Sequence, residues 1–206
     1  MERVLENSWE KEAWNKEECV VGIDEAGRGP IAGPLVVAGV VFPPFYENNE
    51  IYDSKKLSEK KREQLYQVIM EEALEFQIKV VSEKEVDEYN IYRATQLAMH
   101  TIAESLSAHI VVTDAMPLPD CSKMVYPVVK GDQKSISVAA ASILAKVTRD
   151  HIMVELDKLY PEYGFAKHKG YPTKAHLEAL EKYGVLDCHR KSYGPVAKMN
   201  QMKLEL

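Results

Sequence analysis

The chain has 206 residues, of which 46% are hydrophobic and 28% are charged, and its formal net charge is −6 at pH 7. This balance is typical of a globular protein with one good core, so we expect a single domain over residues 1–206. The sequence has no apolar run of the length that spans a bilayer. The acidic balance excludes a binder that holds polyanions over its whole surface, but it leaves room for a local basic patch.

The N-terminal segment and the cysteines indicate the compartment. Residues 1–18 alternate charged and apolar residues and contain no apolar signal core, so we expect a packing arm with a short amphipathic helix. The apolar residues expected on one side of it are Val4, Leu5, Trp9 and Trp14. The three cysteines, Cys19, Cys121 and Cys188, are unevenly spaced, which favours a reducing cytoplasm over a disulfide framework. We expect a cytoplasmic monomer.

Two adjacent acids follow the first apolar run of the chain. Residues 19–24 read as a buried strand, which ends at Asp24 and Glu25 and leads into Gly27-Arg28-Gly29. Glycines at this point let the backbone bend and approach a ligand closely. A second apolar strand over residues 35–42 is expected to pair antiparallel with the first. Alone, the acids could be a solvated turn and the glycines a common loop; together they suggest a metal and a phosphate in one place.

The middle of the chain alternates helices and strands. After Asp53-Ser54-Lys55-Lys56, Ser58 is expected to cap a helix with its body at 61–70, and a solvated loop is the alternative for the two lysines. The next predicted elements are a strand over 77–81, helices over 82–88 and 91–106, strands over 109–114 and 124–129, and a helix over 137–159. The helix before residues 109–114 suggests a crossover, so that strand is expected to lie parallel to the first.

The last forty residues are basic. Residues 165–174 combine lysines with Tyr171 and a glycine, Thr173 is expected to cap a helix that runs to Tyr183, and residues 189–191 form a second basic cluster. We expect these cations to contact phosphates, with a solvated helix flank as the alternative. The cations are Lys167, Lys169, Lys174, Arg190 and Lys191.

Four acids from three segments form a candidate metal site. They are Asp24, Glu25, Asp114 and Asp132. Each alone could be structural, since Asp132 could stabilise the start of the following helix and Asp114 could be a turn residue. Gathered at neighbouring strand ends, however, they would repel one another unless a cation lies among them. A set of carboxylates without His or Cys favours Mg²⁺ or Mn²⁺, and a pair of such ions about 4 Å apart supports phosphodiester hydrolysis.

Five segments, in order, resemble the bacterial ribonuclease HII family, the type 2 ribonucleases H, from about residue 20 to residue 196. The segments are Gly22-Ile23-Asp24-Glu25-Ala26-Gly27-Arg28-Gly29-Pro30, Asp53-Ser54-Lys55-Lys56-Leu57-Ser58, Lys130-Gly131-Asp132, Ala140-Ala141-Ser142-Ile143-Leu144-Ala145-Lys146-Val147-Thr148-Arg149-Asp150 and His168-Lys169-Gly170-Tyr171. The resemblance implies an α/β ribonuclease H-like fold, a five-stranded mixed sheet flanked by helices, with a C-terminal helical segment at about 165–206 that binds substrate.

The resemblance also implies an activity and roles for individual residues. Members hydrolyse the RNA strand of RNA–DNA hybrids and nick on the 5′ side of single ribonucleotides in duplex DNA, leaving 3′-hydroxyl and 5′-phosphate ends. The four acids match the family's metal site. Residues 27–29 match the turn that contacts the 2′-hydroxyl, and Tyr171 matches the tyrosine that stacks on the deoxyribose past the junction. The candidate substrate-binding residues are Gly27, Arg28, Gly29, Tyr171, Lys55, Lys134, Lys167 and Lys169.

Two departures from the family pattern are minor. Ala115 and Met116 follow Asp114 where a glycine is expected, and the first eighteen residues match no pattern. This arm is too short for the added N-terminal domain of the type 3 enzymes. A nucleic-acid-binding module without catalysis is one alternative, but it would gain nothing from carboxylates beside phosphates. A phosphatase or nucleotide hydrolase is the other, and Tyr171 with the Gly-Arg-Gly turn favours a polymeric substrate over it.

Overall fold

The computed structural model of the chain describes residues 5–204, with side chains for residues 5–201. Two compact units divide the chain. We call the first the sheet unit; it takes in the chain up to Ala26, residues 36–79 and residues 95–147. The second, the helical unit, takes in Gly27–Leu35, Val80–Ala94 and the chain from Thr148 onward. A single domain remains a prediction.

Five strands make one mixed sheet, as predicted. They are β1 (Val20–Ala26), β2 (Leu35–Val41), β3 (Glu75–Val81), β4 (Ile110–Asp114) and β5 (Met124–Val128), in the order β3-β2-β1-β4-β5. The predicted pairings are confirmed, because β1 lies antiparallel to β2 and parallel to β4. β5 continues the parallel part beside β4. Three neighbouring strands therefore end at the same edge of the sheet.

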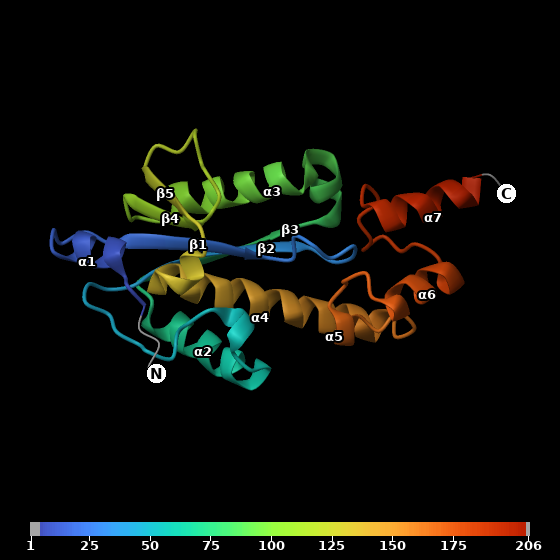
Figure 1. The fold of residues 1–206 in the computed structure, drawn as a ribbon, viewed down its shortest axis with the longest axis horizontal. Coiled ribbons are helices and arrows are strands. Elements are labelled where there is room, and N and C mark those ends of the chain that lie inside the picture. Colours follow the sequence, from blue (N-terminus) through green and yellow to red (C-terminus); the bar gives the residue numbers. More distant parts are fainter. Residues whose placement is uncertain (1–4, 205–206) are drawn as a thin grey trace. The chain divides into compact units, whose positions relative to one another are not determined.

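Helices cover both faces of the sheet. Figure 1 shows the C-terminal part of α3 (Glu83–Ser105) on one face and the start of α4 (Ile136–Leu159) on the other, with α2 (Glu59–Glu72) on the same side as α4. Two glycines let these helices approach: a Cβ at Gly39 would lie 2.4 Å from the Ile102 side chain, and one at Gly22 would lie 2.1 Å from the Ser137 backbone. Burial on both faces explains the continuous apolar run of β1.

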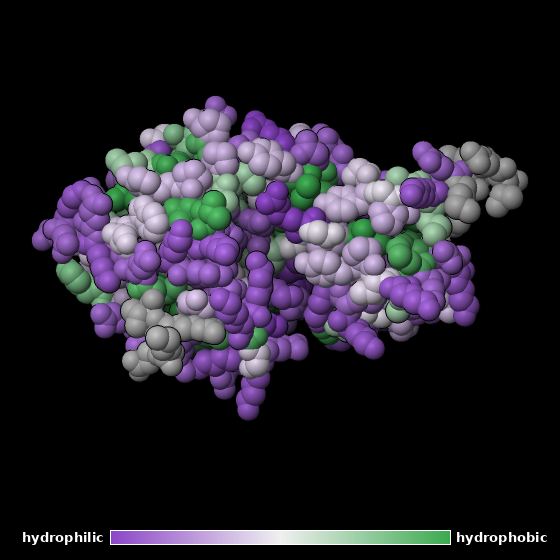
Figure 2. All heavy atoms as spheres, viewed as in Figure 1, coloured by the Kyte–Doolittle hydropathy of each residue, from purple (hydrophilic) through white to green (hydrophobic). Residues whose placement is uncertain are grey.

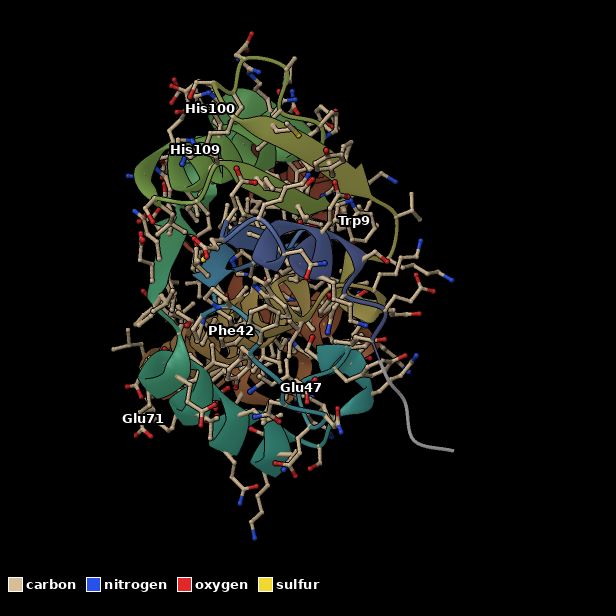
Figure 3. The ribbon with its side chains drawn as sticks, turned by 90° about the vertical axis from the view of Figure 1, so that its left-hand side faces the viewer. Trp9, Phe42, Glu47, Glu71, His100 and His109 are labelled. Carbon is tan, nitrogen blue, oxygen red and sulfur yellow. The ribbon has the colours of Figure 1, made fainter. Side chains whose placement is uncertain are left out.

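The N-terminal arm packs against the sheet unit. Its helix, α1 (Ser8–Trp14), is shorter than expected, and Figure 3 looks onto it and labels Trp9. Trp9 packs on a buried cluster formed by Ala13, Val20, Val112, Val128 and Val138. Leu5 and Trp14 are buried as well, whereas Val4 lies outside the described residues. The arm therefore contributes to the core, which agrees with the packing role predicted for it.

The predicted helix caps are confirmed. The Ser58 hydroxyl accepts from the Lys61 amide at 3.3 Å, and the Thr173 hydroxyl accepts from the His176 amide at 3.3 Å. Gly184, with φ 92°, ends α6 (Lys174–Tyr183). The two helices predicted over 82–88 and 91–106 are confirmed, because α3 consists of two helices that meet at Asn90, whose φ and ψ of 60° and 160° are not helical.

The remaining elements are short or C-terminal. They are η1 (Ser54–Lys56), η2 (Gly131–Gln133), α5 (Phe165–His168) and α7 (Gly194–Leu204). The helical unit has its own core, built around Ile31, Met153, Phe165, Leu180 and Val196.

No helix in residues 5–204 combines the length and the apolar character needed to cross a membrane. On the face drawn in Figure 2, hydrophilic residues cover most of the described surface and apolar residues form separate patches.

Candidate active site

The sheet topology gathers three of the four predicted acids at neighbouring strand ends. Asp24 and Glu25 lie near the end of β1, and Asp114 is the last residue of β4. Because Ile23 pairs with Thr113 in parallel register, the residues that follow them, Asp24 and Asp114, reach the same edge. Asp132 joins this edge from η2, which follows β5.

Asp24 is buried, with 6% of its surface exposed. Its Oδ1 accepts a hydrogen bond from the Glu25 amide at 2.7 Å. Burial raises the pKa of Asp24 well above its usual range, and the negative charges of Glu25, Asp114 and Asp132 raise it further. The four acids therefore act on one another as a single electrostatic cluster.

Asp114 and Asp132 are linked through the backbone of η2. The amide of Gly131 donates to Asp114 Oδ1 at 2.9 Å, which fixes the start of η2 against the end of β4. Asp132 is 4% exposed. Its pKa is raised to about 6, first by burial and then by the charges of Asp53 and Asp114, while Lys55 acts in the opposite direction.

A fifth acid, Asp53, lies beside Asp132, although it was not among the predicted site residues. It is buried, and its Oδ1 accepts from the Lys55 amide at 3.0 Å as the cap of η1. Its Oδ2 accepts from Gln133 Nε2 at 3.1 Å, so one carboxylate joins η1 to η2 beside Asp132. The Asp-Ser-Lys-Lys motif contains Asp53, but the sequence alone does not distinguish an aspartate that caps a helix from one that belongs to an acidic site.

The two predicted lysines of the sheet unit differ in their surroundings. Lys55 is exposed, and although burial of part of it lowers its pKa, attraction to Asp24, Asp132 and Asp53 outweighs this effect and raises the pKa. Lys55 is thus a cation held in the field of the acids. Lys134 ends η2 and is half-buried, and its carbonyl accepts from the Asn7 amide at 2.8 Å.

The acids fit a divalent cation in kind and in charge. Their donor atoms are all carboxylate oxygens, the ligands of hard ions, and their mutual repulsion is what a bound cation would relieve. Among residues 5–201, however, no three His, Cys, Asp or Glu side chains converge closely enough to be ligands of one ion. The predicted acids therefore lie near one another, but their described side chains do not converge on the position of a single ion.

The Gly-Arg-Gly turn and Tyr171 lie together in the helical unit. A Cβ at Gly29 would come within 3.3 Å of Tyr171 Cε1, so the glycine lets the turn lie close against the ring. Arg28 and Gly29 are exposed, and Tyr171 is 47% exposed. Gly27 is required for another reason: its φ is +100°, and a Cβ there would lie 2.2 Å from Arg149 Nε.

Only some of the cations predicted to contact phosphates are exposed. Lys167, Lys174 and Lys191 are exposed, while Lys169 is half-buried with φ 50°. The prediction for Arg190 is wrong, because its side chain is fully buried and donates to backbone carbonyls. The sequence of a basic cluster does not show whether an arginine faces solvent or is buried and donates hydrogen bonds to the carbonyls of a loop.

Comparisons with known proteins agree with this architecture. The Ribonuclease HII family model matches residues 21–196. The chain is 52% identical over 190 residues to a ribonuclease HII of Clostridioides difficile, covering 91% of this chain and 74% of that one. It is 54% identical over 179 residues to one of Francisella tularensis, covering 86% and 96%.

Solved structures extend the match to the fold. The ribonuclease H2 of Pyrococcus horikoshii superposes with a TM-score of 0.77 at 26% identity, covering 91% of this chain and 100% of that one. The ribonuclease HII of Archaeoglobus fulgidus, solved in complex with PCNA, gives 0.74 at 29% identity, covering 85% and 95%. Sequence and fold thus lead to one assignment: the chain belongs to the ribonuclease HII family and is an endonuclease of the ribonuclease H class.

Proposed function

We propose that this enzyme hydrolyses the RNA strand of RNA–DNA hybrids and nicks duplex DNA on the 5′ side of a single embedded ribonucleotide, leaving 3′-hydroxyl and 5′-phosphate ends. The observation that carries the proposal is the cluster of mutually repelling carboxylates at the ends of β1 and β4. Such a cluster is costly in a resting protein, and it suits a reaction in which positive charge must be gathered around a phosphate.

Asp24, Glu25, Asp114 and Asp132 would hold Mg²⁺ or Mn²⁺, as a pair of ions. When bound, the ions supply an activated water and compensate the charge on the leaving oxygen. The protein's own contribution is to keep these acids ready. The Gly131 amide orients Asp114, and the Glu25 amide orients Asp24. Lys55, in the field of the acids, is suited to contact a phosphate oxygen of the cleaved strand.

The choice of sugar is assigned to residues 27–29 and Tyr171. A 2′-hydroxyl both donates and accepts hydrogen bonds, and it is what distinguishes RNA from DNA. The exposed backbone at Arg28 and Gly29 can approach a ribose closely because Gly29 has no side chain. The Tyr171 ring packs best on a sugar without a 2′-hydroxyl, so it would select a deoxyribose on the other side of the cut.

The remaining lysines are proposed to bind phosphates without reading sequence. Lys167 and Lys169 would act beside Tyr171, and Lys134 beside η2. We further propose that the enzyme is a monomer of the reducing cytoplasm, in keeping with the free thiols of Cys19, Cys121 and Cys188.

A labelled DNA duplex with one embedded ribonucleotide tests the proposal. With Mg²⁺ or Mn²⁺, the wild-type enzyme should nick once, on the 5′ side of the ribonucleotide, and leave a 3′-hydroxyl that a polymerase extends. An identical all-DNA duplex should stay intact. Cleavage on the 3′ side of the ribonucleotide, a 2′,3′-cyclic phosphate end, or hydrolysis of a simple phosphomonoester in place of the duplex would each overturn it.

A further inference from the structure

Two buried arginines lie behind the Gly-Arg-Gly turn of the helical unit. Arg149, on α4, is 1% exposed, and Arg190, which precedes α7, is fully buried. Burial and the nearby Arg190 lower the pKa of Arg149 to about 10, and burial lowers that of Arg190, yet both guanidinium groups remain cationic at neutral pH. Apolar residues of similar volume would avoid the cost of burying two cations that repel each other. The presence of two buried arginines therefore needs an explanation, and we look for it in the hydrogen bonds that their N–H groups donate.

Arg190 uses its whole guanidinium on the turn. Nη2 donates to the carbonyl of Gly27 at 2.7 Å and to that of Gly33 at 2.9 Å, and Nε donates to Gly33 at 3.0 Å. Nη1 donates to the carbonyl of Arg28 at 3.2 Å and to the Tyr193 hydroxyl at 3.0 Å. That hydroxyl donates in turn to the Arg28 carbonyl at 2.7 Å.

Arg149 holds the rest of the same loop. Nε donates to the Pro34 carbonyl at 2.9 Å, and Nη2 donates to the Ala32 carbonyl at 3.1 Å. Nη1 donates to the Lys169 carbonyl at 2.9 Å, which joins the loop to the segment that carries Tyr171. The two arginine side chains thus bind five carbonyls of this loop, at residues 27, 28 and 32–34, and a sixth at Lys169, two residues before Tyr171.

Holding the carbonyls fixes where the amides point. In a planar trans peptide, the carbonyl of one residue and the N–H of the next point in opposite directions. Because the carbonyls of Gly27 and Arg28 face Arg190, the amides of Arg28 and Gly29 face away from it. Both residues are exposed, and Gly29 lies against the Tyr171 ring. The arginines thereby turn two backbone donors away from the buried guanidinium group of Arg190, at the position proposed to meet the ribose.

We propose that Arg149 and Arg190 are positioning residues that set ribose selectivity, by holding the carbonyls of residues 27, 28 and 32–34 inward and presenting the amides of Arg28 and Gly29 to the sugar. The inference rests on the proposed reading of the ribose by residues 27–29. Both side chains are buried and donate to backbone carbonyls, so neither is placed to touch the substrate. A lysine cannot replace either one, because a single ammonium group lacks the planar fork that reaches several carbonyls at once.

The test is binding of two matched duplexes without divalent metal, so that no cleavage occurs. One duplex carries a single ribonucleotide and the other is all DNA, and the readout is the ratio of their dissociation constants. Wild type should prefer the ribonucleotide duplex. Arg190→Lys should lower the preference by about tenfold while affinity for the all-DNA duplex stays near the wild-type value. Tyr193→Phe, which removes one hydroxyl, should lower it by a smaller factor.

Arg93→Lys is the matched control, because it makes the same substitution at an exposed position of the helical unit, and it should keep the wild-type ratio. Circular dichroism checks that each variant is folded; if Arg190→Lys is not, Arg149→Lys and Tyr193→Phe decide. Folded variants that keep the wild-type ratio would overturn the inference. Wild type that binds both duplexes equally, and that cuts neither of them once Mg²⁺ or Mn²⁺ is added, would instead overturn the proposed function, so the two failures are distinguishable.

Discussion

Asp24 shows why the candidate metal site is electrostatically costly without a cation. Its pKa is raised by burial, and then by Glu25 and Asp114. A folded pKa above the unfolded value means that the folded protein binds more protons, so stability from this group is present at low pH and lost as the pH rises through the folded pKa. At neutral pH the carboxylate therefore weakens the metal-free protein.

Asp24→Asn removes that carboxylate and should separate activity from folding. We expect the metal-free variant to be at least as stable as wild type at pH 7, while its cleavage rate at saturating Mg²⁺ falls by about a hundredfold or more. Asp120→Asn, in an exposed loop, is the matched control and should change neither property. Near wild-type cleavage by Asp24→Asn would remove Asp24 from the site.

The backbone conformation of Ala115 explains why a glycine is expected after Asp114. Its φ is 57°, in the left-handed region that disfavours an L-residue, and its amide donates to the carbonyl of Val128 at 3.1 Å. Ala115→Gly should raise the free energy of unfolding by about 0.5–1 kcal/mol, measured by urea titration. The same substitution at the exposed helical Ala175 should lower it by about 1 kcal/mol. A loss of stability in Ala115→Gly would contradict this account.

At the scale of elements, α6 contributes a feature that no sequence pattern predicted. The Tyr171 carbonyl can only accept, so His176 Nδ1, at 2.9 Å, carries the proton there. His176 Nε2 must then accept from His189 Nε2 at 3.1 Å, and His189 Nδ1 accepts from the Leu186 amide at 3.0 Å. Both rings are therefore neutral, each in one tautomer. Protonating either would break this chain of hydrogen bonds behind Tyr171.

The histidine pair should make the helical unit sensitive to acid. Burial lowers the pKa of both His176 and His189 to about 4, from 6.5. The stability that the neutral pair contributes is complete above pH 6.5 and is lost as the pH falls toward 4, by about 1.4 kcal/mol per pH unit for each extra proton that the unfolded chain binds. NMR titration should find both rings neutral at about pH 5.5 in the folded protein. Protonation of either ring above pH 6 would contradict the prediction.

The exposed lysines of α5 and α6 should set the salt dependence of binding. Replacing Lys167 and Lys174 together by Gln should weaken the binding of duplexes of any sequence equally. It should also reduce the slope of log affinity against log salt by about 0.9 for each phosphate that the variant no longer neutralises. Lys158→Gln, at an exposed position of α4, is the control. An unchanged slope in the double variant would mean that the phosphate-binding face lies elsewhere.

At the scale of the whole molecule, sequence predicted what depends on periodicity and on motif order. The apolar runs of β1 and β4, each ending in an acid, were sufficient to place Asp24 and Asp114 on neighbouring strand ends. The two compact units and the hydrogen bonds of Arg149 and Arg190 could not be predicted, because they depend on contacts between residues far apart in the chain. Asp53 was missed for the same reason, since its bond to Gln133 spans 80 positions.

The most direct test of the account compares two substrates cut by wild type, Asp114→Asn and Tyr171→Ala: a duplex with one ribonucleotide and a hybrid with an all-RNA strand. Wild type should cut both with divalent metal, and Asp114→Asn should cut neither. Tyr171→Ala should keep its fold and lose about tenfold or more of its rate at the lone ribonucleotide, because the sugar is no longer held in line with the acids. Wild-type rates at the lone ribonucleotide in either variant would contradict the account.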